Sequence, residues 1–140
     1  MATIVKCRPL VAGYGCGKIL TTHQNISFWG GVDPLSGLII DRRHPQFGES
    51  VGGRIIALTQ SIGSSSGSSI LLELLSRDAG PAGIILGVPD QILTLGAVVA
   101  QEMGYHSIPV VLLDRRKFDS LPACLRIGED GSISSFRMRS

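Results

Sequence analysis

The chain has 140 residues, a hydrophobic fraction of 44% and a formal net charge of +2, from 13 Lys and Arg against 11 Asp and Glu. This length and composition suffice for one domain with a substantial core, which we assign to residues 1–140. The near balance of charge argues against nucleic-acid binding, and no window of eighteen apolar residues indicates a membrane span. Because the N-terminus also lacks a basic and apolar leader pattern, the sequence predicts a soluble cytoplasmic protein.

The first fifty residues are rich in β-branched residues and are interrupted by turn signals. Clusters of glycine or proline occur at residues 13–17, 30–34 and 43–45. This pattern is typical of short strands joined by loops. We therefore expect a β-rich N-terminal part, with a turn at the glycines of 13–17.

A segment of small residues follows the apolar run at 55–58 and precedes a helix-like stretch. Its members are Gly63, Ser64, Ser65, Ser66, Gly67 and Ser68. Glycines let the backbone approach a ligand closely, and the free amides of a helix N-terminus favour negative charge. The segment is therefore a candidate site for an anion or an alkoxide. A plain linker or a capping serine explains the same residues without a ligand.

From residue 54 onward, apolar runs alternate with helical stretches. The runs at 55–58, 83–86 and 108–113 predict strands, and the stretches at 68–77 and 91–103 predict helices. This βαβαβ order predicts an α/β fold with a small parallel sheet and crossover helices. Residues 125–127 and 132–136 predict a closing hairpin across the Glu129–Asp130–Gly131 turn.

Two carboxylates follow predicted strands, where ligands of parallel sheets collect. Asp90 comes after the strand at 83–86, and Asp114 comes after the strand at 108–113. Each also has a purely structural reading, because Asp90 can cap the next helix and Asp114 can cap the turn at Arg115. Both readings stay open at this point.

His44 is the candidate for substrate contact among the three histidines. Two arginines precede it, and Pro45 after it favours an extended backbone. A polar surface loop explains it equally well.

The cysteines indicate the compartment and the absence of a metal site. Cys7, Cys16 and Cys124 are odd in number and widely spaced. This fits a reducing compartment and argues against a disulfide framework and a self-contained zinc site. We expect this chain alone to bind no metal.

Several motifs in a fixed order give the chain a resemblance to a known family. They are ISFWGGVDP at 26–34, GLIID at 37–41 with HP at 44–45, and GSSSGS at 63–68, followed by GII at 83–85 and GAVVA at 96–100. With these motifs the chain resembles the small subunit, or swivel domain, of the aconitase X family over about residues 17–114. The resemblance implies a swivelling β/β/α domain that docks on a larger subunit, the pair forming a hydro-lyase.

The resemblance also implies roles for the small-residue segment. By its position in the motif, Ser64 is the catalytic serine; Ser65 or Ser66 takes this place if the register shifts by one. The implied substrate-binding residues are Gly63, Ser65, Ser66, Gly67, Ser68 and His44. The large subunit supplies most of the pocket and the iron or iron–sulfur centre.

The chemistry of dehydration agrees with these roles. Removing water from a 3-hydroxy acid needs a base at the α-carbon, a Lewis acid at the β-hydroxyl, and donors that hold the carboxylate. Ser64 can be the base only if its alkoxide is stabilised, and the N–H groups of residues 65–68 at a helix N-terminus are the available donors. The chain alone is expected to be catalytically silent.

Two substrates are compatible with the resemblance, cis-3-hydroxy-L-proline and mevalonate 5-phosphate. The charged fraction of 17% is unlike that of hyperthermophiles, and the small-residue segment has no Lys or Arg to hold a phosphate. These points favour cis-3-hydroxy-L-proline, with pyrroline-2-carboxylate as the product. A phosphohistidine swivel domain is a remote alternative, because residues 96–104 are similar to the helix of such domains but residues 91–95 directly before them contain no histidine. A non-catalytic ligand-binding subunit is a further alternative.

Overall fold

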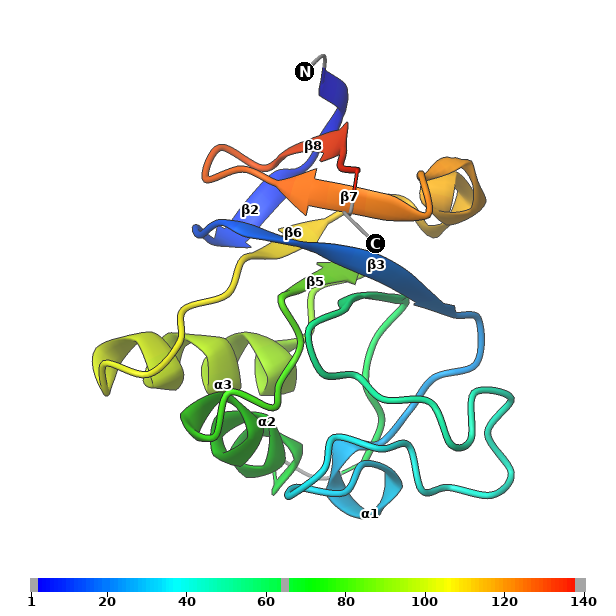
Figure 1. Cartoon of the computed structure of the whole chain (residues 1–140), viewed down its shortest axis with the longest axis vertical. Helices are drawn as coiled ribbons and strands as arrows, with labels where there is room; N and C mark the ends of the chain where they lie inside the picture. Colours follow the sequence, from blue (N-terminus) through cyan, green and yellow to red (C-terminus); the bar gives the residue numbers. More distant parts are fainter. Residues whose placement is uncertain (1–2, 64–65, 138–140) are drawn as a thin grey trace.

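The computed structural model describes residues 3–63 and 66–137. Its eight strands follow the order β1-β8-β7-β3-β4-β5-β6-β2 (Figure 1). The strands are β1 (Thr3–Lys6), β2 (Arg8–Val11), β3 (Gly15–Thr22), β4 (Ile55–Leu58), β5 (Gly83–Leu86), β6 (Val110–Leu112), β7 (Cys124–Ile127) and β8 (Ser132–Ser135). The helices are α1 (Phe28–Gly31), α2 (Ser66–Ser76), α3 (Gln91–Glu102) and the 3₁₀ helix η1 (Arg115–Ser120). In this part of the chain no helix is both long and apolar enough to cross a bilayer.

The centre of the sheet consists of four parallel strands, β3 to β6. Helix α2 connects β4 with β5, and α3 connects β5 with β6. The two helices lie side by side on the same side of the sheet (Figure 1). The α/β fold with a small parallel sheet and crossover helices is thereby confirmed, as is the hairpin of β7 and β8. Parallel pairing also places the carboxyl ends of these strands at one edge.

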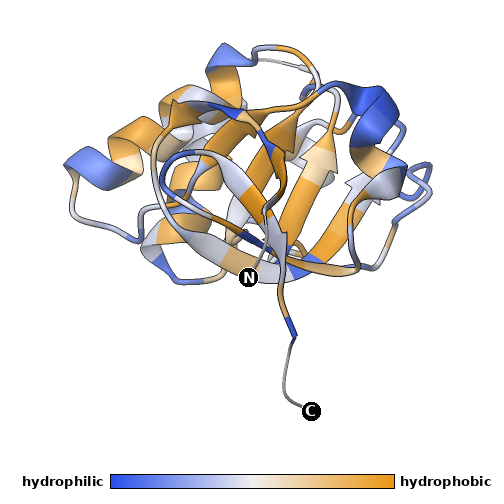
Figure 2. Cartoon of the chain, turned by 90° about the horizontal axis from the view of Figure 1, so that it is seen from above, coloured by the Kyte–Doolittle hydropathy of each residue, from blue (hydrophilic) through white to orange (hydrophobic). Residues whose placement is uncertain are grey.

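Strand β4 is buried on both faces, so its residues alternate between two hydrophobic cores. Ile56 and Leu58 belong to the core beneath α2 and α3. Ile55 and Ala57 belong to a second core, on the other face, that includes Phe118 of η1. Figure 2 shows hydrophobic residues concentrated in the central strands and hydrophilic residues mainly at the periphery. Burial on both faces is why this run is continuously apolar in the sequence.

The N-terminal strands curl the sheet around the second core. Only Cys7 separates β1 from β2, yet β1 pairs with β8 and β2 pairs with β6 at opposite ends of the strand order. The Cys7 N–H donates to the Gly131 carbonyl at 2.8 Å, which ties this crossing to the β7–β8 turn. The two ends of the sheet are therefore held close together.

The turn predicted at residues 13–17 is wrong in its second half, because Gly15 and Gly17 lie in β3. A Cβ atom on Gly15 would overlap the carbonyl oxygen of Ala82, and one on Gly17 would overlap that of Gly53. Both glycines thus permit close approach of a neighbouring backbone instead of forming a turn. The presence of glycines in a sequence does not by itself distinguish a turn from a close contact between two backbones.

Substituting Gly15→Ala is expected to lower the free energy of unfolding by about 1–3 kcal/mol, because the Ala82 backbone must move. Gly31→Ala is the matched control, since a Cβ there would meet only Ile26 and Ser27 side-chain carbons, at 3.6 and 4.0 Å. Urea unfolding of the two variants measures the difference. Equal stability of both variants would contradict the close approach at Gly15.

Candidate functional site

The residues after β4 run beside the residues after β5 at the carboxyl edge of the sheet. The Thr59 carbonyl accepts hydrogen bonds from the N–H groups of Gly87 and Val88, both at 3.1 Å. Two residues later, Ser61 donates its backbone N–H and its hydroxyl to Oδ2 of Asp90, at 2.5 and 2.6 Å. The chain that leads into the small-residue segment is therefore hydrogen-bonded to the loop that leads into α3.

Asp90 is the N-cap of α3, as the structural reading of the sequence predicted. Its Oδ1 accepts from the N–H groups of Ile92 and Leu93, at 2.9 and 3.2 Å. The side chain is buried, with 7% of the residue exposed. Its second role, accepting from Ser61, was missed by sequence reasoning. The available signal was a carboxylate after the neighbouring parallel strand, which points to proximity but not to a partner.

A second set of contacts holds the segment on the side of α1. The Ile62 N–H donates to the Ile26 carbonyl at 3.0 Å, and Ile26 forms a parallel bridge with Ser61. Gly63 has a φ of +101°, a backbone conformation that favours glycine. A Cβ atom there would lie 2.7 Å from the Ser27 hydroxyl oxygen. The close approach of the backbone to Ser27 here therefore depends on glycine at position 63.

Helix α2 includes the last three residues of the segment, Ser66, Gly67 and Ser68. Gly67 is buried, and a Cβ atom on it would lie 3.2 Å from Ile92 of α3 and 3.7 Å from Phe28 of α1. Ser66 and Ser68 lie in the first turn of α2, where backbone N–H groups point away from the helix toward the segment. The N-terminal end of α2 therefore favours a negative charge placed beside it.

Ser64 and Ser65 lie outside the described residues. Their assigned roles, catalytic for Ser64 and substrate-binding for Ser65, stay predictions. So do the substrate-binding roles of Gly63, Ser66, Gly67 and Ser68. Gly63 lies directly before residues 64–65, and Ser66, Gly67 and Ser68 follow them, at the carboxyl edge of the sheet.

His44 is buried, with 3% of the residue exposed, although it lies in a loop in which residues 41–43 and 47–49 are exposed. Its Nδ1 accepts from the Gln46 N–H at 3.1 Å, and its Nε2 lies 3.1 Å from the Gln24 carbonyl oxygen. Because a carbonyl only accepts, these partners require the neutral tautomer with the proton on Nε2. Both ring nitrogens are thus occupied within the chain. Its substrate-binding role stays a prediction, and its contacts account for a structural one.

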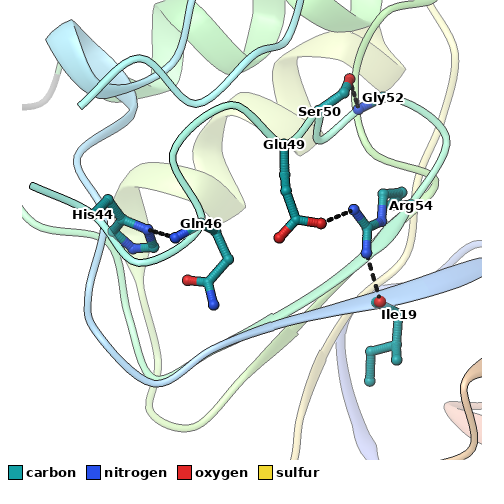
Figure 3. Close-up of polar contacts among 7 residues, drawn as sticks. All are labelled: Ile19, His44, Gln46, Glu49, Ser50, Gly52 and Arg54. Atoms are coloured by element: carbon teal, nitrogen blue, oxygen red, sulfur yellow. Dashed lines mark hydrogen bonds and ion pairs between the residues drawn. The ribbon is translucent and has the colours of Figure 1, made fainter. Parts of the chain in front are cut away.

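The loop around His44 is attached to the sheet by a charged pair (Figure 3). Arg54 donates from Nη1 to Glu49 at 2.9 Å and from Nη2 to the Ile19 carbonyl of β3 at 3.0 Å. Ser50 accepts the Gly52 N–H at 3.1 Å. The irregular segment between β3 and β4 is therefore held by specific polar contacts.

Asp114 caps η1, in agreement with its structural reading. It accepts the Arg116 N–H at 2.9 Å and pairs with the Arg116 guanidinium at 2.6 Å. The hydrogen bond from that guanidinium lowers the pKa of Asp114 to about 2. Next to this turn is a depression of about 300 Å³ lined by His23, Thr59 and η1. No hydrogen bond between described residues joins Asp114 to the small-residue segment.

The described residues contain no group of three or more His, Cys, Asp or Glu side chains placed to hold a metal ion. Cys16 lies in β3 opposite Arg126, and Cys124 lies in β7 opposite Lys18. Cys7 is in the second core, and its burial raises the pKa of its thiol to about 11. The cysteines of this chain thus do not converge on the carboxyl edge.

His44→Ala is expected to lower the free energy of unfolding by about 1–3 kcal/mol, because it leaves the Gln24 carbonyl and the Gln46 N–H without their partner. His23→Ala is the control, since the His23 side chain is 68% exposed and its ion-pair partner, Asp119, is 80% exposed. Its effect should stay within about 0.5 kcal/mol. Thermal unfolding followed by circular dichroism measures both, and a stable His44→Ala variant would contradict the structural role.

Comparisons with known proteins identify the fold and the family. The family model for the aconitase X swivel domain matches residues 4–132. In the crystal structure of aconitase X from Thermococcus kodakaraensis, one chain superposes with a TM-score of 0.81 at 28% identity, covering 94% of this chain and 97% of that one.

Two curated relatives have different substrates in their names. The cis-3-hydroxy-L-proline dehydratase of Pseudomonas aeruginosa is 47% identical over 87% of this chain, which spans only 21% of that relative. The phosphomevalonate dehydratase small subunit of Methanothermobacter thermautotrophicus is 35% identical over 69% of this chain and 73% of its own length. The resemblance seen in the sequence motifs is confirmed, and the chain belongs to the aconitase X swivel domain family.

Proposed function

We propose that this chain is the swivel part of a hydro-lyase that dehydrates cis-3-hydroxy-L-proline to pyrroline-2-carboxylate. The observation that carries the proposal is the small-residue segment, which runs from the buried Ser61–Asp90 contact to the first turn of α2 at the carboxyl edge of a parallel sheet. The 47% identity to a dehydratase of this substrate supports the same assignment. Family membership supports the reaction class.

In the proposed reaction, Ser64 is the base that removes the proton from the α-carbon. An ordinary serine hydroxyl is far too weak an acid to supply an alkoxide at neutral pH. The backbone N–H groups at the start of α2 and the positive end of its dipole are the stabilising device that this chain offers. Glycines at 63 and 67 let the chain on each side of residues 64–65 pack closely against its neighbours, Ser27 at one end and Ile92 and Phe28 at the other.

A large subunit is proposed to complete the site. The name of the phosphomevalonate relative as a small subunit supports a partner of this kind. The described part of this chain offers no ligand set for iron, so any iron or iron–sulfur centre belongs to the partner in this proposal. When bound there, such a centre supplies a Lewis acid for the leaving hydroxyl. The free cysteines support a reducing, cytoplasmic location.

Mevalonate 5-phosphate is the alternative substrate, supported by several small-subunit relatives, one at 35% identity. The higher identity to the hydroxyproline enzyme and the absence of Lys or Arg in residues 59–69 favour hydroxyproline. A phosphohistidine role is disfavoured because Asp90, not a histidine, occupies the cap of α3. A non-catalytic subunit would bind the same substrate as in our proposal, but its complex would not dehydrate that substrate.

Ser64→Ala should lower kcat by at least about 10²-fold while the chain still assembles with its large subunit, because only the base is removed. The measurement is formation of pyrroline-2-carboxylate by the co-expressed, iron-supplied complex. Ser65→Ala and Ser66→Ala test the register of the loop. Ser76→Ala, at the far end of α2, is the control with full activity expected.

The outcomes separate the alternatives. Retained turnover in Ser64→Ala would remove this serine from the mechanism, and loss in Ser65→Ala or Ser66→Ala alone would move the base to that position. Turnover of mevalonate 5-phosphate but not of hydroxyproline would select the alternative substrate. Binding of either compound by the wild-type complex without turnover would select the non-catalytic subunit.

Exposed apolar side chains beside the segment form the proposed docking face for the large subunit. Trp29, with 60% of the residue exposed, lies two residues after Ser27, which is close to Gly63, and Ile62 is exposed directly before the segment. Ile40 is also exposed, and its N–H donates to the Gly31 carbonyl at 2.9 Å. Large exposed apolar groups of this kind are typical anchors of protein interfaces.

Trp29→Ala should weaken assembly with the large subunit by about 2 kcal/mol, or about thirtyfold in Kd, without unfolding the chain. Tyr14→Ala is the matched control, because Tyr14 is similarly exposed, at 51%, but precedes β3 at the opposite edge of the sheet. Titration of one subunit into the other by calorimetry measures the affinities. Equal affinities of both variants would contradict this docking face.

A further inference from the structure

Asp90 accepts hydrogen bonds from two parts of the chain with its two carboxylate oxygens. Oδ2 accepts from the N–H and the hydroxyl of Ser61, and Oδ1 accepts from the N–H groups of Ile92 and Leu93. All four partners donate, which is the pattern that an ionised carboxylate satisfies in full. No Lys or Arg pairs with Asp90 among the described ion pairs. The α3 cap alone needs only one of these oxygens.

The chain on each side of residues 64–65 contacts the first turn of α3. Ser61, two residues before the small-residue segment, is bonded to Asp90, the cap of that turn. Gly67, within the segment, is so close to Ile92 that a Cβ atom would lie 3.2 Å from its side chain. A single short stretch, residues 90–92, therefore contacts the chain before and after residues 64–65.

Loss of the hydrogen bonds from Ser61 to Asp90 would be energetically unfavourable. Ser61 is 9% exposed and Asp90 is 7% exposed, so neither group has ready access to water in place of its partner. A buried N–H left without an acceptor costs more than an ordinary hydrogen bond contributes. The chain can avoid that cost only by moving Ser61 outward, which displaces the residues after it.

We infer that Asp90 is a positioning residue for catalysis, which acts through Ser61 to fix the point at which the chain enters the serine loop. The inference rests on the proposed function, since it assumes that the loop carries the base. A displacement of about 1 Å in a reacting group can reduce the rate about 10²-fold. Asp90 itself touches no reacting atom in this account.

Asp90→Asn separates the two roles of the carboxylate. An amide has one accepting oxygen, and Asn caps helices as well as Asp, so that oxygen can stay on Ile92 and Leu93. The NH2 group then faces Ser61, whose hydroxyl can turn to accept a hydrogen bond but whose backbone N–H cannot. The variant thus removes the anchor of the loop and keeps the cap.

Asp130→Asn is the matched control. Asp130 accepts the N–H of Ser132 on Oδ1 at 3.0 Å and its hydroxyl on Oδ2 at 2.9 Å, so it receives the same two kinds of donor that Asp90 receives from Ser61 on one oxygen. It lies in the turn between β7 and β8, away from the carboxyl edge of the parallel strands. Ser61→Ala is a second test, since it removes the hydroxyl and keeps the N–H.

Two measurements test the inference. The first is amide hydrogen exchange of this chain, in which Asp90→Asn should speed exchange at Ser61 and Ile62 but not at Leu93. The second is steady-state kinetics of the assembled complex, in which kcat should fall about 10²-fold with KM nearly unchanged. Ser61→Ala should give a smaller fall in kcat, and Asp130→Asn should give none.

A purely structural role for Asp90 predicts a lower unfolding temperature and yield, with kcat per assembled complex unchanged, and that result would overturn the inference. Exchange at Ser61 that is unaffected by Asp90→Asn would overturn it as well. If the wild-type complex dehydrates neither substrate, the proposed function fails. Faster exchange at Ser61 in the chain alone then still supports the anchor, because it needs no turnover.

Discussion

Strands β3, β4, β5 and β6 pair in parallel, and this pairing determines where the loops that leave them lie. Once these strands run in one direction, all their carboxyl ends meet at one edge, and the loops that leave them must lie together. This pairing is stable because β4 and β5 bury both faces, one against the helices and one in the second core. The position of the candidate site at the carboxyl edge therefore follows from the burial of β4 and β5 on both faces.

The same arrangement explains why so few polar groups determine the geometry of the edge. Thr59 and Ser61 leave β4 next to residues 87–90, because the two parallel strands end in register. A buried carboxylate at the end of the second strand can therefore serve the following helix and the preceding loop at once. Asp114 occupies the equivalent place after β6, but it is paired with the exposed Arg116 and organises only its own turn.

The sequence predicted those features that follow from local pattern. Continuous apolar runs at 55–58 and 83–86 gave the parallel strands, and the position of Asp90 before a helical stretch gave its capping role. Features that depend on distant contacts were not predictable. The bond between Ser61 and Asp90 joins residues 29 positions apart, and burial of His44 depends on the Gln24 carbonyl. The backbone approach at Gly15 likewise depends on Ala82.

Division of the proposed chemistry between two chains fits the residues present. A base that must be precisely placed needs rigid support, and this chain provides that with a helix N-terminus, two tightly packed glycines and a buried anchor. A metal centre needs a cluster of ligands, which the described part of this chain does not contain. A domain that carries only the base can move relative to the metal without disturbing its ligands. In the proposed enzyme, the hydrogen bonds from Ser61 to Asp90 hold the start of the serine loop on this chain, independently of where the metal centre lies.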